Sequence, residues 1–169
     1  VTIDLGGQTV RRHAIIDLGD GNNSLTVQNG TVHGHLVVKG GSGSDDVDIQ
    51  SDATIRRNTR ILLEYGDNSL SFSGEAEQHL VYVGREGSDV IDILAGASVK
   101  RHAKIVAGSG DNSVSVDGAI DRHLIVRGEE GNDTIDLLAN ANVRWNAVLH
   151  MGDGDNQLNL SGDIGRSLV

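Results

Sequence analysis

The chain has 169 residues, of which 37% are hydrophobic and only 2% aromatic, with 23 glycines and neither proline nor cysteine. The lack of cysteine excludes a disulfide framework and a thiolate metal site. A formal net charge of −10 argues against nucleic acid as a partner, and no apolar run approaches the roughly 18 residues of a membrane span, so membrane insertion is not expected.

A short pattern recurs along the chain: glycine, a small polar residue, Asn or Asp, any residue, an apolar residue, any residue, an apolar residue. Its seven copies are GNNSLTV, GSDDVDI, GDNSLSF, GSDVIDI, GDNSVSV, GNDTIDL and GDNQLNL. Their third residues, here called the anchors, are Asn23, Asp45, Asn68, Asp89, Asn112, Asp133 and Asn156. Because Asn and Asp alternate at steps of 21–23 residues, two kinds of coil form a repeat unit of about 44 residues.

A second motif lies between the anchors: an apolar residue, two mostly polar ones, usually His or Asn, and then an alternating apolar run. Its copies are VRRHAII, VHGHLVV, IRRNTRI, AEQHLVY, VKRHAKI, IDRHLIV, VRWNAVL and the truncated IGRSLV. The alternation predicts a second β-strand, so we expect two main strands in each coil, joined by turns that contain glycine.

Such a short coil buries its apolar face only by stacking on its neighbours. The expected inward columns are Leu25, Val47, Leu70, Ile91, Val114, Ile135, Leu158 and Val27, Ile49, Phe72, Ile93, Val116, Leu137, Leu160. The sequence therefore predicts an all-β fold, a parallel β-helix (β-solenoid) of about eight coils of 21–23 residues. It forms one domain over residues 1–169, or an excerpt of a longer solenoid, with coils that start near residues 1, 24, 46, 69, 90, 113, 134 and 157.

Stacking also aligns the polar residues in columns. Between the apolar columns we expect carboxylates to alternate with neutral groups, in the order Asp4, Thr26, Asp48, Ser71, Asp92, Ser115, Asp136, Asn159. Another set forms a basic stripe: Arg11, Arg12, Arg56, Arg57, Lys100, Arg101 and Arg144. This stripe is either a solvated face or a contact surface for an anionic polysaccharide or a neighbouring rod.

A column of His and Asn residues precedes the second strand: His13, His35, Asn58, His79, His102, His123 and Asn146. We interpret it, together with Asn23, Asn68, Asn112 and Asn156, as a structural ladder whose side chains bond along the stack. Transition-metal binding by the histidines is the alternative.

The stretch from Gly40 to Ile49, GGSGSDDVDI, has a specific form, with Gly40, Gly41, Gly43, Asp45 and Val47 spaced as G-G-x-G-x-D-x-U, where U is a large apolar residue. With its weaker copies around Asp89 and Asp133, the chain resembles the haemolysin-type calcium-binding (RTX-like) repeats and the β-strand-repeat solenoids of secreted bacterial surface proteins. The resemblance implies secretion and Ca²⁺ bound by oxygen ligands, here at Gly41, Gly43, Asp45, Asp89 and Asp133.

The sequence also departs from that family. The motif recurs once per roughly 22 residues instead of twice per 18, the anchor is Asn in every second coil, and the two kinds of loop are expected to differ in length. Two interpretations stay open: a calcium-loaded ladder, and a glycine-turn ladder of hydrogen-bonded Asn and Asp that requires no cofactor.

The uninterrupted repeat favours a structural role as part of an extracellular or cell-surface bacterial fibre, stalk or adhesin. The chain begins within one strand and stops within another, so its expected partners are other copies of itself, further coils of the same chain, or a polysaccharide. Alternatives are a calcium-binding RTX-like domain and a polysaccharide-binding or polysaccharide-cleaving β-helix. Because the carboxylates recur along the rod instead of clustering, we expect no enzyme.

Overall fold

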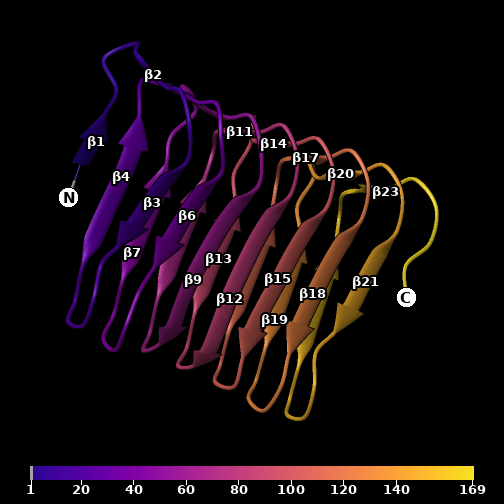
Figure 1. Ribbon diagram of the computed structural model, residues 1–169. Helices are drawn as coiled ribbons and strands as arrows, with labels where there is room; N and C mark the ends of the chain where they lie inside the picture. The colour runs from indigo at the N-terminus through magenta and orange to yellow at the C-terminus, as the bar shows by residue number, and fades with distance from the viewer. Residues whose placement is uncertain (1) are drawn as a thin grey trace.

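A computed structural model describes residues 2–169 and shows a parallel β-solenoid, which confirms the predicted fold class (Figure 1). Its 23 strands lie in three parallel sheets, called here A, B and C, and the described residues contain no helix. Each coil passes once through A, B and C before a loop leads to the next coil. The chain makes seven complete coils of this kind and ends in an eighth that contributes one strand each to A and B. Val1, where the first coil was expected to start, lies outside the described residues.

Sheet A contains the apolar residues that follow the anchors. Its strands, in stacking order, are β1 (Thr2–Asp4), β4 (Ser24–Gln28), β7 (Asp46–Ile49), β10 (Ser69–Phe72), β13 (Val90–Ile93), β16 (Ser113–Val116), β19 (Thr134–Leu137) and β22 (Gln157–Leu160). Sheet C contains the second motif's alternating run. Its strands are β3 (Ala14–Asp17), β6 (Leu36–Lys39), β9 (Thr59–Tyr65), β12 (Leu80–Glu86), β15 (Ala103–Gly108), β18 (Leu124–Gly128) and β21 (Ala147–His150).

Sheet B corrects the prediction of two strands per coil. Its strands are β2 (Thr9–Val10), β5 (Gly30–Val32), β8 (Ala53–Ile55), β11 (Glu75–Ala76), β14 (Ser98–Val99), β17 (Ala119–Ile120), β20 (Asn142–Val143) and β23 (Asp163–Ile164). Each ends on the first apolar residue of the second motif, and the polar residues that follow turn the corner into sheet C. A strand of two or three residues is too short to show an alternating pattern, which is why the sequence did not reveal it.

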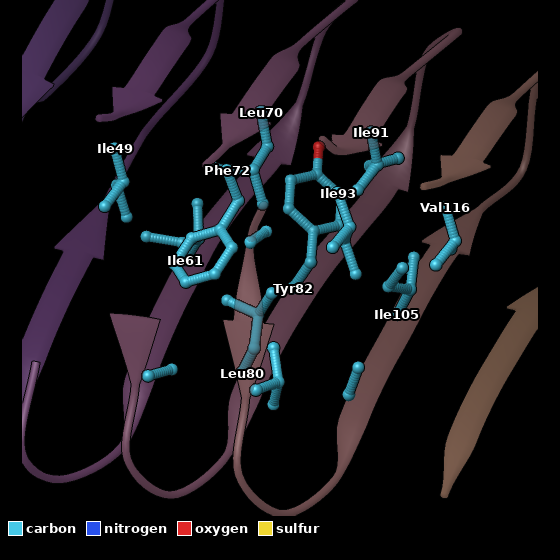
Figure 2. Close-up of a cluster of buried hydrophobic side chains, with 14 of the residues drawn as sticks. Ile49, Ile61, Leu70, Phe72, Leu80, Tyr82, Ile91, Ile93, Ile105 and Val116 are labelled. Carbon is cyan, nitrogen blue, oxygen red and sulfur yellow. The ribbon is translucent and has the colours of Figure 1, made fainter. Parts of the chain in front are cut away.

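The core lies between the three sheets and contains the expected columns. In sheet A, the inward column from Leu25 to Ile135 and the inward column from Val27 to Leu137 are at most 2% exposed. Phe72 and Tyr82, from sheets A and C, meet in the middle of the rod among isoleucines and leucines (Figure 2). Leu158 and Leu160 are 39% and 44% exposed because β22 is an edge strand of sheet A among the described residues.

The first coil has a different register from the expected one. Ile3 pairs with Val27 and Asp4 with Gln28, so Asp4 does not belong to the column of Thr26 and Asp48. Instead its carboxylate accepts hydrogen bonds from the Gly6 N–H at 2.8 Å and the Gln28 amide at 3.1 Å. These bonds hold the corner into sheet B and fix the shifted register.

The alternating length of the coils arises at the corner between sheets A and B, which is longer in one kind of coil than in the other. The expected difference in length between the two kinds of anchor loop is wrong. Every anchor follows the first residue of its sheet C strand by nine positions, as Asp45 follows Leu36 and Asn68 follows Thr59. At the opposite corner, residues 94–96 precede the buried Ala97 in an Asp coil, whereas Asp117 alone precedes Gly118 in the next Asn coil. A Cβ on Gly118 would lie 3.0 Å from the Ala97 Cβ, so glycine lets the short turn pack closely against its longer neighbour.

Candidate functional site

The anchors form a continuous hydrogen-bonded ladder along the inside of the loops. The backbone N–H of each anchor donates to the side-chain Oδ1 of the anchor in the next coil, at 2.8–3.0 Å from Asn23 to Asn156. Asp45, Asn68, Asp89, Asn112 and Asp133 are at most 3% exposed. Because Asn and Asp offer the same acceptor, both residue types support the ladder.

The two anchor types differ in what their second side-chain atom does. The Nδ2 of Asn23, Asn68 and Asn112 donates to the carbonyl two residues earlier, at 2.8–2.9 Å. A carboxylate cannot donate this bond when ionised. The Oδ2 atoms of Asp45 and Asp133 are buried and have no hydrogen-bond partner among the described residues.

A glycine five residues before each Asp anchor gives this second oxygen its room. A Cβ on Gly40, Gly84 or Gly128 would collide with Oδ2 of Asp45, Asp89 or Asp133 respectively. The same position in the Asn coils holds side chains, namely Leu18, Leu63, Ala107 and Met151. Each Asp coil therefore replaces an apolar side chain by a carboxylate oxygen.

Burial changes the acidity of these carboxyl groups. It raises the pKa of Asp89 from its ordinary value of 3.8 to about 6, although the hydrogen bond from the Asn68 N–H opposes the rise. Burial also raises the pKa of Asp133. The buried Tyr82 hydroxyl responds in the same way, since burial and the nearby charge of Asp89 both raise its pKa. An ionised carboxylate at Asp89 or Asp133 is thus costly in this core.

The five residues expected to ligate calcium do not converge in this arrangement. Asp45, Asp89 and Asp133 lie two coils apart, roughly 9–10 Å at 4.8 Å per coil. No group of three or more His, Cys, Asp or Glu side chains in residues 2–169 could hold a metal ion. A cavity of about 10 Å³ lies against Asn112, Gly128 and Asp133, about the volume that one water molecule needs. Calcium binding stays a prediction.

Gly41 and Gly43 serve the close stacking of the loops. Gly43 has φ 116° and belongs to a glycine column whose other members have φ between 98° and 132°: Gly21, Gly66, Gly87, Gly110, Gly131 and Gly154. A Cβ on Gly43 would lie 2.6 Å from the carbonyl oxygen of Gly21 in the coil before it. Only glycine combines this backbone conformation with so close an approach.

The His/Asn column lies at the corner between sheets B and C, where its rings stack. Centroids are 4.9 Å apart for His13 and His35, and 5.0 Å apart for the pairs His79–His102 and His102–His123. The His35 N–H donates to Nδ1 of His13 at 2.9 Å, and the Asn58 N–H donates to Nδ1 of His35 at 3.2 Å. Parallel rings at this spacing do not point their nitrogens at a common centre.

At the other end of the column, Asn146 lies beside Trp145, which packs edge-on against His123 with centroids 5.2 Å apart. The guanidinium groups of Arg122 and Arg166 lie 4.9 and 4.5 Å from the Trp145 ring centroid. Both arginines were outside the predicted sets.

The residues of the basic stripe are all exposed and follow the same corner. Arg56 lies 3.9 Å from Glu77 and Lys100 lies 3.4 Å from Glu75, so acidic neighbours partly neutralise the stripe. Exposed pairs of this kind contribute little to stability.

One group of residues was missed by the sequence analysis: Glu64, Tyr65 and Arg85. The Arg85 guanidinium lies 6.0 Å from the Tyr65 ring centroid, and its Nε lies 3.9 Å from Oε2 of Glu64. The signal that could have found them is the loop Glu64-Tyr65-Gly66-Asp67-Asn68, which has Glu where the other Asn loops have glycine.

Comparisons with family models, with curated proteins and with solved structures find no match for this chain. The parallel β-solenoid and its repeat of about 22 residues therefore rest on the chain's own geometry. Among the described residues, no helix is long and apolar enough to cross a bilayer.

Proposed function

We propose that this chain is a structural rod of an extracellular or cell-surface bacterial fibre, stalk or adhesin. The observation that carries the proposal is the unbroken stacking of three parallel sheets, in which β1 and β22 are the edge strands of sheet A. Their outer edges offer backbone groups to a further strand. The partner is a further coil of the same chain or a second copy stacked end to end.

The apolar end of the rod supports such stacking. Leu158 and Leu160 on β22 are 39% and 44% exposed, while their counterparts in the stack, Ile135 and Leu137, are 1% exposed. Another coil placed on β22 would bury both leucines, and each would contribute roughly 1 kcal/mol or more. The resemblance to secreted repeat proteins supports an extracellular location, and the lack of cysteine is compatible with it.

Electron microscopy and analytical ultracentrifugation of the purified chain test this proposal. We expect end-to-end oligomers or filaments that grow with concentration. The double variant Leu158→Lys with Leu160→Lys would place charges on the stacking end and abolish the oligomers. The control Gln157→Lys, an outward position on the same strand, should leave oligomer formation unchanged. A chain that stays monomeric at high concentration, or oligomers that persist in the double variant, would count against stacking through β22.

An alternative function is calcium binding by RTX-like loops. What favours it is the pair of unpartnered, buried Oδ2 atoms of Asp45 and Asp133. Calcium prefers six to eight oxygen ligands, and carbonyl oxygens of the stacked loops would supply the others. Calorimetric titration with Ca²⁺, alongside a melting scan, tests this: binding should raise the melting temperature and be weakened by Asp45→Asn. Titration without heat or thermal shift would remove this alternative.

We further propose that the rod has no catalytic activity, with polysaccharide cleavage as the minor alternative. The support is that Asp48, Asp92 and Asp136 recur at equivalent register positions two coils apart. Incubation with acidic polysaccharides should leave their chain length unchanged, and any depolymerisation would contradict this.

A further inference from the structure

One anchor loop departs from the repeat at a cost in stability. Four residues before the anchor, three of the Asn coils have glycine in the left-handed region: Gly19, Gly108 and Gly152, with φ 72°, 88° and 75°. The fourth has Glu64 at φ 64°. A side chain in this conformation costs about 1–2 kcal/mol, so the loop has given up stability that the other coils retain. Strain of this kind is concentrated at functional sites.

The next residue departs as well. Tyr65 occupies the position that holds the small polar Asp20, Ser109 and Asp153 in the other Asn coils. It is 41% exposed, in a chain with only 2% aromatic residues. An exposed aromatic ring of this kind offers a flat apolar face with a hydroxyl at one end.

Stacking brings Arg85 from the following coil beside both residues. Its guanidinium lies 6.0 Å from the Tyr65 ring centroid, and its Nε lies 3.9 Å from Oε2 of Glu64. The Arg85 and Glu64 side chains are 59% and 44% exposed, so this pair contributes little to stability and both groups remain open to a ligand.

Tyr65 and Arg85 border a hollow of about 380 Å³ on the outside of sheet C, within the size range of small-molecule sites. Its lining also includes Val83, Gly84, Glu86, Val106, Gly108, Ser109 and Glu129. The pairing of β9 with β12 shifts register on both sides of Gly84, and that of β15 with β18 shifts before Gly108. Such irregularities are frequent next to binding sites, where they redirect side chains.

The chemistry of the lining selects the ligand. The charged groups of the lining are the Arg85 guanidinium and the carboxylates of Glu86 and Glu129, so the hollow has net negative charge and repels anions. Carboxylates and guanidinium groups bind vicinal hydroxyls, while a tyrosine ring packs against the apolar face of a sugar ring. We propose that this hollow binds a neutral saccharide unit of a polysaccharide, with Tyr65 as the stacking platform and Arg85 and Glu86 as hydrogen-bonding groups.

Titration of the whole chain with neutral hexasaccharides tests the site. The probes are maltohexaose, cellohexaose, laminarihexaose and mannohexaose, with an alginate hexasaccharide as the acidic comparison, and binding is followed by amide chemical shifts. We expect at least one neutral probe to bind at millimolar concentration or below, with shifts around Tyr65 and Arg85, and the acidic probe to bind more weakly. Tyr65→Ala should weaken binding about tenfold or more.

The double variant Glu64→Gly with Tyr65→Ser keeps this test independent of folding. It copies the residues of the next Asn loop, Gly108 and Ser109, so we expect it to melt at a higher temperature while losing saccharide binding. Trp145→Ala, which removes the aromatic ring outside the hollow, should bind like the parent chain.

The proposal is overturned if no neutral hexasaccharide binds, if the double variant binds as well as the parent chain, or if alginate binds equally well. Because binding is measured on single chains, its failure and the failure of filament formation are distinguishable.

Discussion

Gly40 and Asp45 are matched across one loop: the Oδ2 atom of Asp45 lies where a Cβ on Gly40 would have to be. The equivalent pair in the next coil is Leu63 and Asn68, both buried. The two-coil repeat therefore reflects side-chain volume as well as charge. Each coil fills this part of the core either with a carboxylate or with an apolar side chain.

Gly40→Ala should destabilise the fold by about 1–3 kcal/mol, because the added methyl group and the Asp45 carboxylate compete for one space. Urea denaturation of Gly40→Ala, Asp45→Ala and the double variant measures the coupling. We expect the double variant to lose less stability than the two single losses combined. Additive losses would mean that Gly40 is needed for another reason, such as its contact with the Leu63 backbone.

Asp89→Asn should make the protein more stable at pH 8. The pKa of Asp89 is raised from 3.8 to about 6, so its folded form favours the proton and stability is lost as pH rises from about 4 through 6. An amide keeps the Oδ1 acceptor for the Asn68 N–H without the buried charge. We expect a gain of about 2–3 kcal/mol at pH 8 that disappears near pH 4.

The measurement for Asp89→Asn is the difference in unfolding free energy between variant and parent across this pH range. The exposed Asp153→Asn serves as the control and should show little pH-dependent difference. A variant whose gain is the same at pH 4 and pH 8 would show that the carboxylate is not the cause.

The histidine column should weaken the rod in acid. Burial lowers the pKa of His35, as do the charges of His13, Arg57 and Arg60, so its folded form resists protonation. A lowered pKa gives stability that is fully present above the ordinary value of 6.5 and is lost as pH falls below it. Protonation of Nδ1 also removes the acceptor for the Asn58 N–H, a bond of about 1 kcal/mol.

His35→Asn tests this, because Asn already occupies the column at positions 58 and 146. Between pH 7.5 and 5 we expect the melting temperature of this variant to fall less than that of the parent chain. His33→Asn, an exposed histidine outside the column, should behave like the parent. An equal fall in all three proteins would assign the acid sensitivity to other groups.

Much of this fold is predictable from the sequence, and particular residues show where prediction stops. The column from Leu25 to Ile135 could be predicted because apolar residues alternate within each strand and the strands recur about every 22 residues. This pattern is typical of coils that stack in parallel. Sheet B could not, since a strand such as Glu75–Ala76 carries too few residues to show a pattern. The equal length of the anchor loops could not be predicted either, because the difference in coil length lies at the corner between sheets A and B, where the sequence has no recurring motif.

The saccharide hollow marks a different limit. Glu64 and Tyr65 were visible as exceptions to a glycine-containing loop. The site they form could not be predicted, because it also needs Arg85. This residue belongs to the next coil and reaches Tyr65 only through the stacking of β9 on β12.

Glu64→Gly alone should raise the stability by about 1 kcal/mol, since glycine adopts the left-handed conformation without the Cβ penalty. The exposed pair with Arg85 that is lost contributes less. Thermal and urea unfolding measure the gain. Ser88→Gly, an exposed loop position in the next coil, is the control for the general effect of added glycine and should not stabilise. A loss of stability in Glu64→Gly would show that Glu64 contributes contacts worth more than its strain.

The alternation of long and short corners, as at Ala97 and Gly118, bears on how the rod can lengthen or shorten. Removing an Asn coil would bring two long corners into contact and set two buried anchor carboxylates roughly 4.8 Å apart, whereas removing an Asp coil would bring two short corners into contact. Removing two leaves every junction as before. We therefore expect insertions, deletions and recombination in such a gene to be tolerated in even numbers of coils, and fusions that extend the rod should be designed in blocks of about 44 residues.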